Sequence, residues 1–475
     1  MDQSAYLHDP TRATGDVLES LVLGEAFART VRRNPERLAL VDGNERLSWS
    51  ELDARVASLV AIALEHGIGK GDVAGICARN GGAFVAAHLA LARIGAVALL
   101  LHPAYSEIEI GELARRTSAR AIFYGEYLQR LGAPGRSGAA EPPAPADPFV
   151  LAPTSGTESP QPKICMHAHE GLLANAMQVV RDAGLSERDV LLPASGFTHL
   201  FGLLALHTAL LSGATIVALP KFDPERCLEL YERESVTHAW AVPAQFSDVA
   251  RVAEARAPRL PALREVRSAG AAMPGALGSR LEKVLGRAPL EHWGMSEIGA
   301  GIVDGIPLRG ADARIVDGEL QYRRADMFRG YYGQPQATSA AMTPDGFLRT
   351  GDVAALDERG RIVLRGRIKE LINRGGMKVS ALELESSLAG LRGMRQLAVV
   401  PVDDDRLGER AALVCTLEAE ASLTLDEVRA HLAERGLAKY KWPELLIVVD
   451  ELPQTPTGKI ARHAVRELAT RAAIA

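Results

Sequence analysis

The sequence has 475 residues, of which 47% are hydrophobic and 24% are charged, as in ordinary globular proteins. This length is too great for a single hydrophobic core and indicates two or more domains. The 54 lysines and arginines against 59 aspartates and glutamates give a net charge of −5. No overall basic field is therefore available, and we expect no nucleic-acid partner and no membrane partner.

The cysteines and the N-terminus point to a cytoplasmic protein. No apolar run reaches the roughly 18 residues that span a bilayer, and the polar start MDQSAYLHDPTRATGD lacks the order of a signal peptide. The cysteines form no CxxC pair, which favours buried, reduced thiols over a disulfide framework or a zinc cluster. These four cysteines are Cys77, Cys165, Cys227 and Cys415.

Apolar periodicity predicts alternating helices and strands between about residues 24 and 123. Leucine and valine recur at helical spacing over residues 50–66, with Ser50 as a candidate N-cap. Short apolar strands are expected at 73–77 and near 96–101, with a helix through residue 91 between them. This order indicates a parallel α/β architecture. The Gly/Pro/Ala-rich stretch 132–148 is expected to be a surface loop.

The same alternation continues to about residue 350 and then changes. Further strands are expected at 190–193, 215–219 and 238–242. From residue 367 onward a smaller α+β domain is predicted. Its elements are strands at 396–402, 411–417 and 444–449 and a helix at 424–434. The fold class is therefore α/β, with a large N-terminal domain of α/β layers over residues 1–366 and a small C-terminal α+β domain over residues 367–475.

The strongest local signal is the segment FVLAPTSGTESPQPK at residues 149–163. A short apolar strand runs into a loop of glycine and hydroxylated residues that ends in Lys163. Such a loop can present backbone N–H groups and hydroxyls to phosphate oxygens, and the lysine adds a positive charge. The glycine spacing differs from the GxxxxGK[ST] phosphate loop. An ordinary turn after a strand is the structural alternative.

Three further motifs follow this loop in order. They are WGMSE at 293–297, RTGD at 349–352 with Gly366-Arg367, and PQTPTGKIAR at 453–462. Together with the loop, they resemble the adenylate-forming superfamily of acyl- and aryl-CoA synthetases, luciferases and peptide-synthetase adenylation domains. The type most similar to this chain is the acyl-/aryl-CoA ligase. The resemblance runs from the segment LSWSEL at 47–52 to Arg462, almost the whole chain.

The resemblance implies a site for ATP and Mg²⁺. Residues of the loop would hold the β- and γ-phosphates, and the segment 268–272 with Trp293 would flank the adenine. The hydroxyl of Ser296 would meet the α-phosphate, the carboxylate of Glu297 would hold Mg²⁺, and Asp352 and Arg367 would bind the ribose. The nucleotide-binding residues implied in this way are Thr154, Ser155, Gly156, Thr157, Lys163, Gly270, Ala271, Trp293, Gly294, Met295, Ser296, Asp352, Arg367 and Gly376.

The resemblance also implies a mobile small domain. Lys459 matches the catalytic lysine of adenylation, and Lys369 matches the hinge about which the small domain turns. Gly375 and Gly376 match a loop that lines the pantetheine tunnel when a thiol attacks. The phosphate loop TSGTESPQPK departs from the usual TSGTTGxPK, because it is one residue longer and lacks the second glycine.

The acid pocket implied by the resemblance contains His199, Phe201, Trp240, Ser268 and Gly270. Amino-acid-activating relatives carry an aspartate that pairs the substrate ammonium, whereas the matching stretch 197–201 has no acidic residue. An unpaired buried ammonium is costly, so we expect an aryl or short-to-medium acyl acid without an α-amine. His199 is either a satisfied core histidine or a gate of this pocket.

The predicted function is ATP-dependent activation of a small carboxylic acid to an acyl-adenylate, followed by transfer to a thiol. Coenzyme A is the first choice of acceptor, and the phosphopantetheine of an acyl carrier protein is the second. The alternatives are a stand-alone adenylation enzyme, which loads a carrier protein or passes the acid to an amine, and a non-catalytic nucleotide-binding module.

Overall fold

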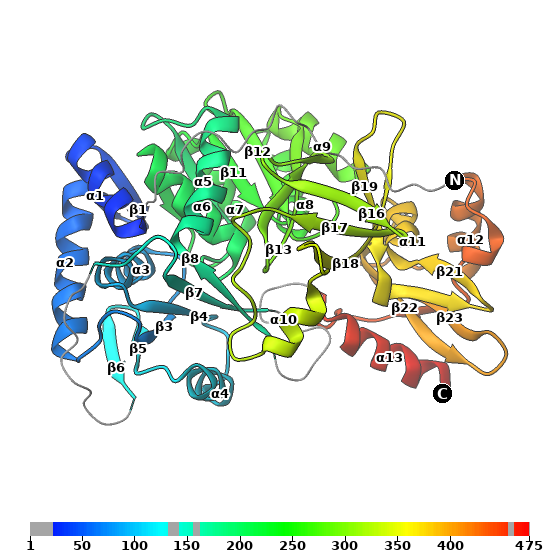
Figure 1. The fold of residues 1–475 in the computed structure, drawn as a ribbon. Coiled ribbons are helices and arrows are strands. Elements are labelled where there is room, and N and C mark those ends of the chain that lie inside the picture. Colours follow the sequence, from blue (N-terminus) through cyan, green and yellow to red (C-terminus); the bar gives the residue numbers. More distant parts are fainter. Residues whose placement is uncertain (1–21, 132–141, 155–161, 455–459, 475) are drawn as a thin grey trace.

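The computed structural model describes residues 22–131, 142–154, 162–454 and 460–474. Two large mixed sheets form one end of the molecule, and two smaller antiparallel-rich sheets follow along it (Figure 1). Within the described residues, no helix combines the length and the apolar character needed to cross a bilayer.

The first large sheet has six strands in the order β6-β5-β3-β4-β7-β8. Its inner strands pair in parallel, and its two outer pairs are antiparallel. The strands are β3 (Val73–Cys77), β4 (Val97–Leu101), β5 (Ala121–Tyr124), β6 (Tyr127–Arg130), β7 (Pro148–Pro153) and β8 (Ile164–Ala168).

The second large sheet has nine strands in the order β15-β14-β13-β12-β11-β9-β10-β1-β2. The strands from β13 to β1 pair in parallel, so their carboxyl ends share one edge of the sheet. The strands are β1 (Leu38–Asp42), β2 (Glu45–Ser48), β9 (Val190–Pro193), β10 (Thr215–Ala218), β11 (His238–Ala241), β12 (Glu265–Ala269), β13 (Pro289–Met295), β14 (Gly299–Val303) and β15 (Ile306–Pro307).

The main core lies between these two sheets and includes almost every side chain of the apolar helices α3 and α6. A second core covers the other face of the nine-stranded sheet with α7 and α8. The helices of this part are α1 (Leu23–Arg33), α2 (Trp49–Glu65), α3 (Gly82–Ile94), α4 (Glu107–Thr117), α5 (His169–Ala183), α6 (Leu200–Ser212), α7 (Pro224–Arg233), α8 (Pro243–Arg256) and α9 (Gly275–Leu285).

A four-stranded antiparallel sheet follows, with its own core around Leu320, Tyr322 and Leu348. Asp352 lies in the middle of its third strand, and Arg367 is the last residue of its fourth strand. Its elements are β16 (Asp312–Val316), β17 (Glu319–Arg323), α10 (Pro335–Ala341), β18 (Leu348–Leu356) and β19 (Ile362–Arg367).

The last sheet lies at the end of the molecule opposite to α1 and α2 (Figure 1). Separate apolar clusters cover its two faces, one with α11 and α12 and the other with α13. Its elements are η1 (Ile368–Glu370), β20 (Leu371–Arg374), β21 (Met377–Ser380), α11 (Ala381–Leu388), β22 (Met394–Asp404), β23 (Gly408–Leu417), α12 (Leu425–Glu434), η2 (Lys439–Lys441), β24 (Leu445–Val448) and α13 (Arg462–Ile474).

The predicted fold class is confirmed, with two local corrections. The N-cap of α2 is Ser48 rather than Ser50, because Ser48 and Glu51 form a reciprocal capping box. Cys77 is only partly buried, whereas Cys165, Cys227 and Cys415 are buried thiols. Residues 132–141 of the predicted loop lie outside the described residues, and β7 begins at its end.

Candidate functional site

A cleft of about 2310 Å³ lies between the nine-stranded sheet and the last part of the chain. Segments that follow the carboxyl ends of β9, β11 and β12 form one wall, together with part of β13. The other wall comes from β19, η1 and α11. Ligands of open parallel sheets bind outside the carboxyl ends of the strands, which is where this cleft lies.

Trp293, Asp352 and Arg367 come together in this cleft. The indole N–H of Trp293 donates to Oδ2 of Asp352 over 2.7 Å, and Nε of Arg367 lies 3.0 Å from Oδ1. Asp352 and Arg367 face each other because β18 and β19 pair antiparallel at this register. Burial raises the pKa of Asp352, while Arg367 and the Trp293 bond act in the opposite direction.

Two glycines leave the backbone accessible from the cleft at this edge of the nine-stranded sheet. Gly270 follows β12 with φ +87° and lines the cleft with Ala271. Gly294 also lines it, and a Cβ there would lie 1.8 Å from the carbonyl oxygen of Gly299. Any side chain at residue 294 would therefore force β13 and β14 apart.

The phosphate-loop motif is the connection of an antiparallel hairpin between β7 and β8. Its base is closed by the N–H of Thr154, which donates to the carbonyl of Lys163 over 2.8 Å. Ser155, Gly156 and Thr157 lie outside the described residues. The hairpin explains how a strand, a loop and a lysine that ends the loop are joined in sequence.

Glu297 and Lys163 both contact Tyr331. The Tyr331 hydroxyl donates to Oε1 of Glu297 over 2.7 Å, and Nζ of Lys163 lies 4.7 Å from the centre of the tyrosine ring. Glu297 is 6% exposed. One aromatic side chain therefore connects the two charged residues that the resemblance assigns to metal and phosphate.

Hydrogen bonds to their backbone atoms hold Met295 and Ser296 in position. Met295 pairs with Gly299 in the β13–β14 ladder and packs against the core of the four-stranded sheet. The carbonyl of Ser296 accepts a 2.7 Å hydrogen bond from Nε2 of His167, whose pKa burial lowers to about 4. His167 on β8 thus ties the two large sheets together beside Glu297.

The predicted acid-pocket residues divide into two groups. His199 and Gly270 line the cleft, and the His199 ring lies 5.6 Å from that of His102. Trp240 is fully buried and stacks on Phe201 at 5.2 Å and 18°, and Ser268 is 2% exposed. Phe201, Trp240 and Ser268 are absent from the cleft lining, because they lie in the packed wall behind it.

A glycine contact fixes the start of α6, where His199 is the N-cap residue. A Cβ on Gly202 would lie 2.2 Å from the carbonyl oxygen of Gly196. The helix can approach the preceding loop only because residue 202 has no side chain. The stretch GFTHLFG therefore has a packing reason for its second glycine in addition to its place beside the cleft.

Lys459 lies outside the described residues, but the described residues on either side of its segment line the cleft. Gln454 and Ile460 pair as an isolated bridge, and both line the cleft. Arg462 of the same motif lies 2.7 Å from Glu385 and 3.5 Å from Glu370. The motif is thus anchored beside η1, the short turn that carries Lys369.

Gly375 and Gly376 form the turn between β20 and β21 and have positive φ values of +56° and +85°. They are absent from the cleft lining. Gln454 and Ile460, in contrast, both line the cleft.

Sequence reasoning missed Tyr331, His292 and Arg267. Arg267 is 3% exposed within β12 and pairs with Glu265, and its guanidinium donates to Nε2 of His292 on β13. The available signal was an arginine at the centre of a short strand, EVRSA. Its partner could not be read from the sequence, because it depends on the register between β12 and β13.

Comparisons with known proteins identify the family. Residues 27–332 match the family described as AMP-binding enzyme, and residues 383–459 match the AMP-binding enzyme C-terminal domain. A salicylyl-CoA synthase / salicylate adenylyltransferase of a Streptomyces species is 32% identical, with 91% of each chain covered. A medium-chain fatty-acid–CoA ligase of Escherichia coli is 28% identical, with 94% of this chain and 90% of the relative covered. The structure of ATP-bound MatB from Rhodopseudomonas palustris is 25% identical, with a TM-score of 0.83 and coverage of 94% of this chain and 99% of that one. This chain therefore belongs to the AMP-binding, adenylate-forming enzymes, and it is an adenylate-forming ligase.

Proposed function

We propose that the protein activates a carboxylic acid without an α-amine as its acyl-adenylate, using ATP, and then transfers the acyl group to coenzyme A. The observation that carries the proposal is the Trp293–Asp352–Arg367 group, which lines the same cleft as the Gly270–Ala271 backbone. An indole, a buried carboxylate and a guanidinium match an adenine face and ribose hydroxyls.

The phosphate end of the nucleotide is assigned to the β7–β8 loop. Thr154, Ser155, Gly156 and Thr157 would supply N–H groups and hydroxyls, and Lys163 would supply positive charge. The hydroxyl of Ser296 would meet the α-phosphate. Glu297 suits Mg²⁺ because a carboxylate oxygen is a hard ligand, and its bond from Tyr331 already orients the group. Mg²⁺ would supply charge neutralisation at the phosphates.

The residues act by positioning and by charge. A carboxylate resists nucleophilic attack because of its own charge, and its attack on the α-phosphorus brings two anionic groups together. The compact ammonium of Lys459 would bridge the carboxylate and the α-phosphate and so stabilise the charge that develops there. Arg462 supports this role, because its ion pairs anchor the motif next to η1.

We propose the boundary between the two domains at residues 366 and 367, at the last residue of β19 and just before η1 begins at Ile368. Lys369 would be the hinge. Rotation there would withdraw Lys459 and bring Gly375 and Gly376 toward the cleft for the thiol step. The short turn between two separately packed cores supports such a rotation.

The acid is proposed to be an aryl or short-to-medium acyl acid. The stretch Phe197–Phe201 at the cleft wall carries no carboxylate that could pair an ammonium. The Phe201–Trp240 stack behind it makes this wall apolar, and burial of each methylene of the acid against an apolar wall contributes about 0.8 kcal/mol. An aryl or acyl acid is therefore expected to exceed its α-amino counterpart by orders of magnitude in kcat/KM.

The test is a product analysis with one acid and two acceptors. The protein is incubated with ATP, Mg²⁺ and an active acid, with either coenzyme A or a carrier protein that bears phosphopantetheine. We expect the acyl-CoA thioester to form faster than the acylated carrier protein. If only the carrier protein is loaded, the acceptor is the carrier and not coenzyme A. This outcome must be checked because the Streptomyces relative is named both as a CoA synthase and as an adenylyltransferase.

A further inference from the structure

An unused hydrogen-bonding atom lies in the inner wall of the cleft. His292 on β13 lines the cleft and is 4% exposed. Its Nδ1 is buried and has no hydrogen-bond partner within the part of the chain that the structure describes. Buried polar atoms in native proteins nearly always have a partner, so this nitrogen requires an explanation.

Arg267 determines whether Nδ1 of His292 is a hydrogen-bond donor or an acceptor. The guanidinium of Arg267 donates to Nε2 of His292, and an arginine has no acceptor to offer. Nε2 must therefore be the acceptor, which leaves the ring hydrogen on Nδ1. Burial, with the neighbouring charge of Arg267, holds the pKa of His292 well below its usual range. The ring is thus neutral, and Nδ1–H is a donor.

The arginine is itself held in place. Its Nε lies 2.5 Å from Oε1 of Glu265, and Nη2 lies 2.7 Å from Oε2. The guanidinium carbon also lies 5.2 Å from the centre of the Trp240 ring. Glu265 and Trp240 therefore fix Arg267, and Arg267 fixes the tautomer of His292.

The surroundings of this donor are aromatic. The rings of Phe201 and Trp240 each lie 6.2 Å from that of His292. On the neighbouring strand, the hydroxyl of Ser268 is likewise buried without a partner among the described residues. A ring or chain bound against His292 would therefore lie on a wall that is backed by aromatic side chains, next to one oriented N–H donor.

We propose that the acid activated by this protein carries a hydrogen-bond acceptor on its ring or chain, apart from the reacting carboxylate, and that Nδ1–H of His292 donates to it. The acceptor is a hydroxyl, ether or carbonyl oxygen. This inference rests on the proposed function and narrows its substrate class. Arg267 and Glu265 are positioning residues, because they act through His292.

Nδ1 of His88 and Nε2 of His169 are also buried without a partner among the described residues, but neither of these rings lines the cleft. His292 differs from them because it lines the cleft and because Arg267 holds its tautomer.

His238 on the neighbouring β11 shows the contrast with His292, because its Nδ1 lies 2.7 Å from the hydroxyl oxygen of Thr237. Burying the Arg267–Glu265 pair carries a desolvation penalty, and packing alone would be served by an apolar side chain. The pair is explained if one ring nitrogen of this cleft-lining histidine must remain a donor.

The experiment measures acid-dependent pyrophosphate release with matched acids on one enzyme preparation. The probes are benzoate, the three monohydroxybenzoates and their methyl ethers, with octanoate and its oxo derivatives for a chain. Wild type should prefer one acceptor-bearing acid over its plain counterpart by about 10- to 100-fold in kcat/KM. The methyl ether retains an acceptor and has no donor, so it should keep the preference where its size is accommodated.

Variants separate the donor from its packing. His292→Phe keeps a ring and removes the N–H, so the preference should fall to within about threefold, whereas His292→Asn restores an amide N–H and should recover part of it. Phe201→Leu is the matched control, which should weaken both acids of a pair equally. The ratio of two acids is unaffected by any inactive fraction of a variant, so partial misfolding cannot mimic the result.

Arg267→Met tests the positioning role by a readout other than activity. Without the guanidinium the ring hydrogen can move to Nε2, and the nitrogen chemical shifts of His292 would report the change. The preference for methyl ethers should then fall more than that for phenols, because Nδ1 could accept from a hydroxyl.

Three results would overturn the inference. They are a wild-type preference for the plain acid in every pair, a preference that survives His292→Phe, and a wild-type Nδ1 that carries no hydrogen. Pyrophosphate release with plain acids alone would refute this inference and leave the proposed function standing. No release with any acid of either kind would refute both.

Discussion

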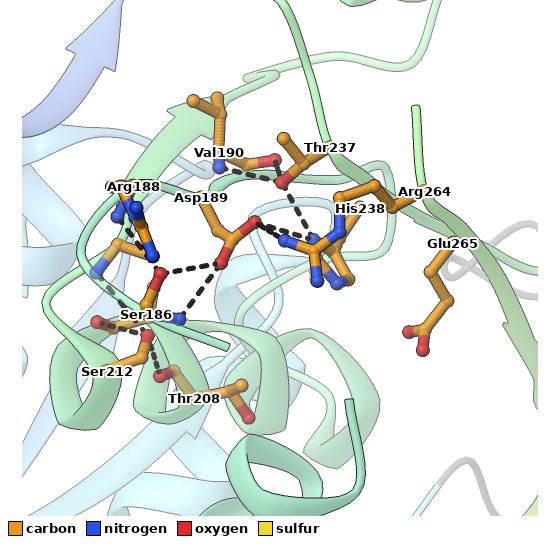
Figure 2. Close-up of polar contacts among 12 residues, drawn as sticks. Ser186, Arg188, Asp189, Val190, Thr208, Ser212, Thr237, His238, Arg264 and Glu265 are labelled. Carbon is orange, nitrogen blue, oxygen red and sulfur yellow. Dashed lines mark hydrogen bonds and ion pairs between the residues drawn. The ribbon is translucent and has the colours of Figure 1, made fainter. Parts of the chain in front are cut away.

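The two edges of the nine-stranded sheet, where its parallel strands begin and where they end, differ in whether their buried polar groups are hydrogen-bonded. At the edge where β9, β11 and β12 begin, Asp189 is 1% exposed and both of its oxygens are paired (Figure 2). Oδ2 accepts from the N–H of Ser186 over 2.9 Å, and Oδ1 accepts from Arg264 over 2.6 Å. The hydroxyl of Thr237 joins the same group through Val190 and His238.

At the opposite edge, where these strands end, several buried polar atoms lack a hydrogen-bond partner among the described residues. We call this the open edge, and the edge that contains Asp189 the closed edge. Within the described chain, Oγ1 of Thr198, Oγ of Ser268 and Nδ1 of His292 have no hydrogen-bond partner. Both edges belong to one sheet and are built from the same strands. The difference indicates that the first edge holds strands in register, while the second is arranged for groups that a ligand supplies.

The largest effect is expected from Lys459, which the motif assigns to the open edge. Lys459→Ala should reduce adenylate formation by about a thousandfold, because it removes a charge that stabilises the transition state. Thiolysis of supplied acyl-adenylate should persist. Pyrophosphate release and thioester formation are measured separately, with exposed Lys439→Ala as the control. Near-normal adenylate formation would remove Lys459 from this role.

Low pH should lower the free energy of unfolding through the histidines in the core between the two large sheets, and not through either edge of the nine-stranded sheet. Burial lowers the pKa of His169 to about 4 and of His207 to about 3, and His207 lies 2.9 Å from His88 between Nε2 atoms. The unfolded chain binds protons below its histidine pKa of about 6.5, whereas these folded histidines stay neutral. Stability is therefore full above that pH and falls as pH decreases toward 4.

The expected slope is about 1.4 kcal/mol per pH unit for each such histidine. Urea unfolding at several pH values measures it, and His207→Phe should flatten the curve. A stability that is constant from pH 7 to about 4.5 would show that these histidines protonate without unfolding.

A smaller loss is expected at the nucleotide end of the open edge. Asp352→Asn removes the charge that Arg367 pairs with and weakens the acceptor for ribose hydroxyls, so the KM for ATP should rise about 10- to 100-fold. The exposed Asp345→Asn, which loses its bonds to Arg314, is the matched control. The comparison of edges would be weakened if both variants kept the wild-type KM.

The smallest effect on activity is expected at the closed edge. Asp189→Asn should lower the free energy of unfolding by about 2 kcal/mol, because buried donors lose a charged acceptor. At temperatures where the variant is folded, kcat/KM should be unchanged. Denaturant titration and steady-state kinetics on the same sample test this, with Asp426→Asn at the exposed start of α12 as the control. A specific loss of activity would mean that the two edges are coupled.

The sequence predicted what depends on short-range pattern. The strand at 73–77 is confirmed as β3, and Asp352 and Arg367 lie within one motif region joined by an antiparallel pair. The sheet β16–β19 and the hairpin β20–β21 were missed as elements. Most of their strands have only four to six residues and are partly exposed, and the nine-residue β18 contains Gly351 and Asp352, which are uncommon in strands.

The rest of the site depends on contacts between distant segments. Tyr331 and Glu297 are 34 residues apart, and Arg267 and His292 are 25 residues apart. The register between parallel strands decides which side chains face each other, and no local pattern reports that register. A tyrosine or histidine beside a motif could be noted in the sequence, but its partner could not be.

The most direct test of the account is ATP–pyrophosphate exchange, measured with radiolabelled pyrophosphate in the absence of coenzyme A. Wild type, Asp189→Asn and Asp352→Asn are compared with and without acids that lack an α-amine. The account predicts exchange that requires the acid, equals wild type in Asp189→Asn and is strongly reduced in Asp352→Asn at limiting ATP. Exchange independent of added acid, or an equal loss in the two variants, would contradict the assignment of adenylation to the open edge of the sheet.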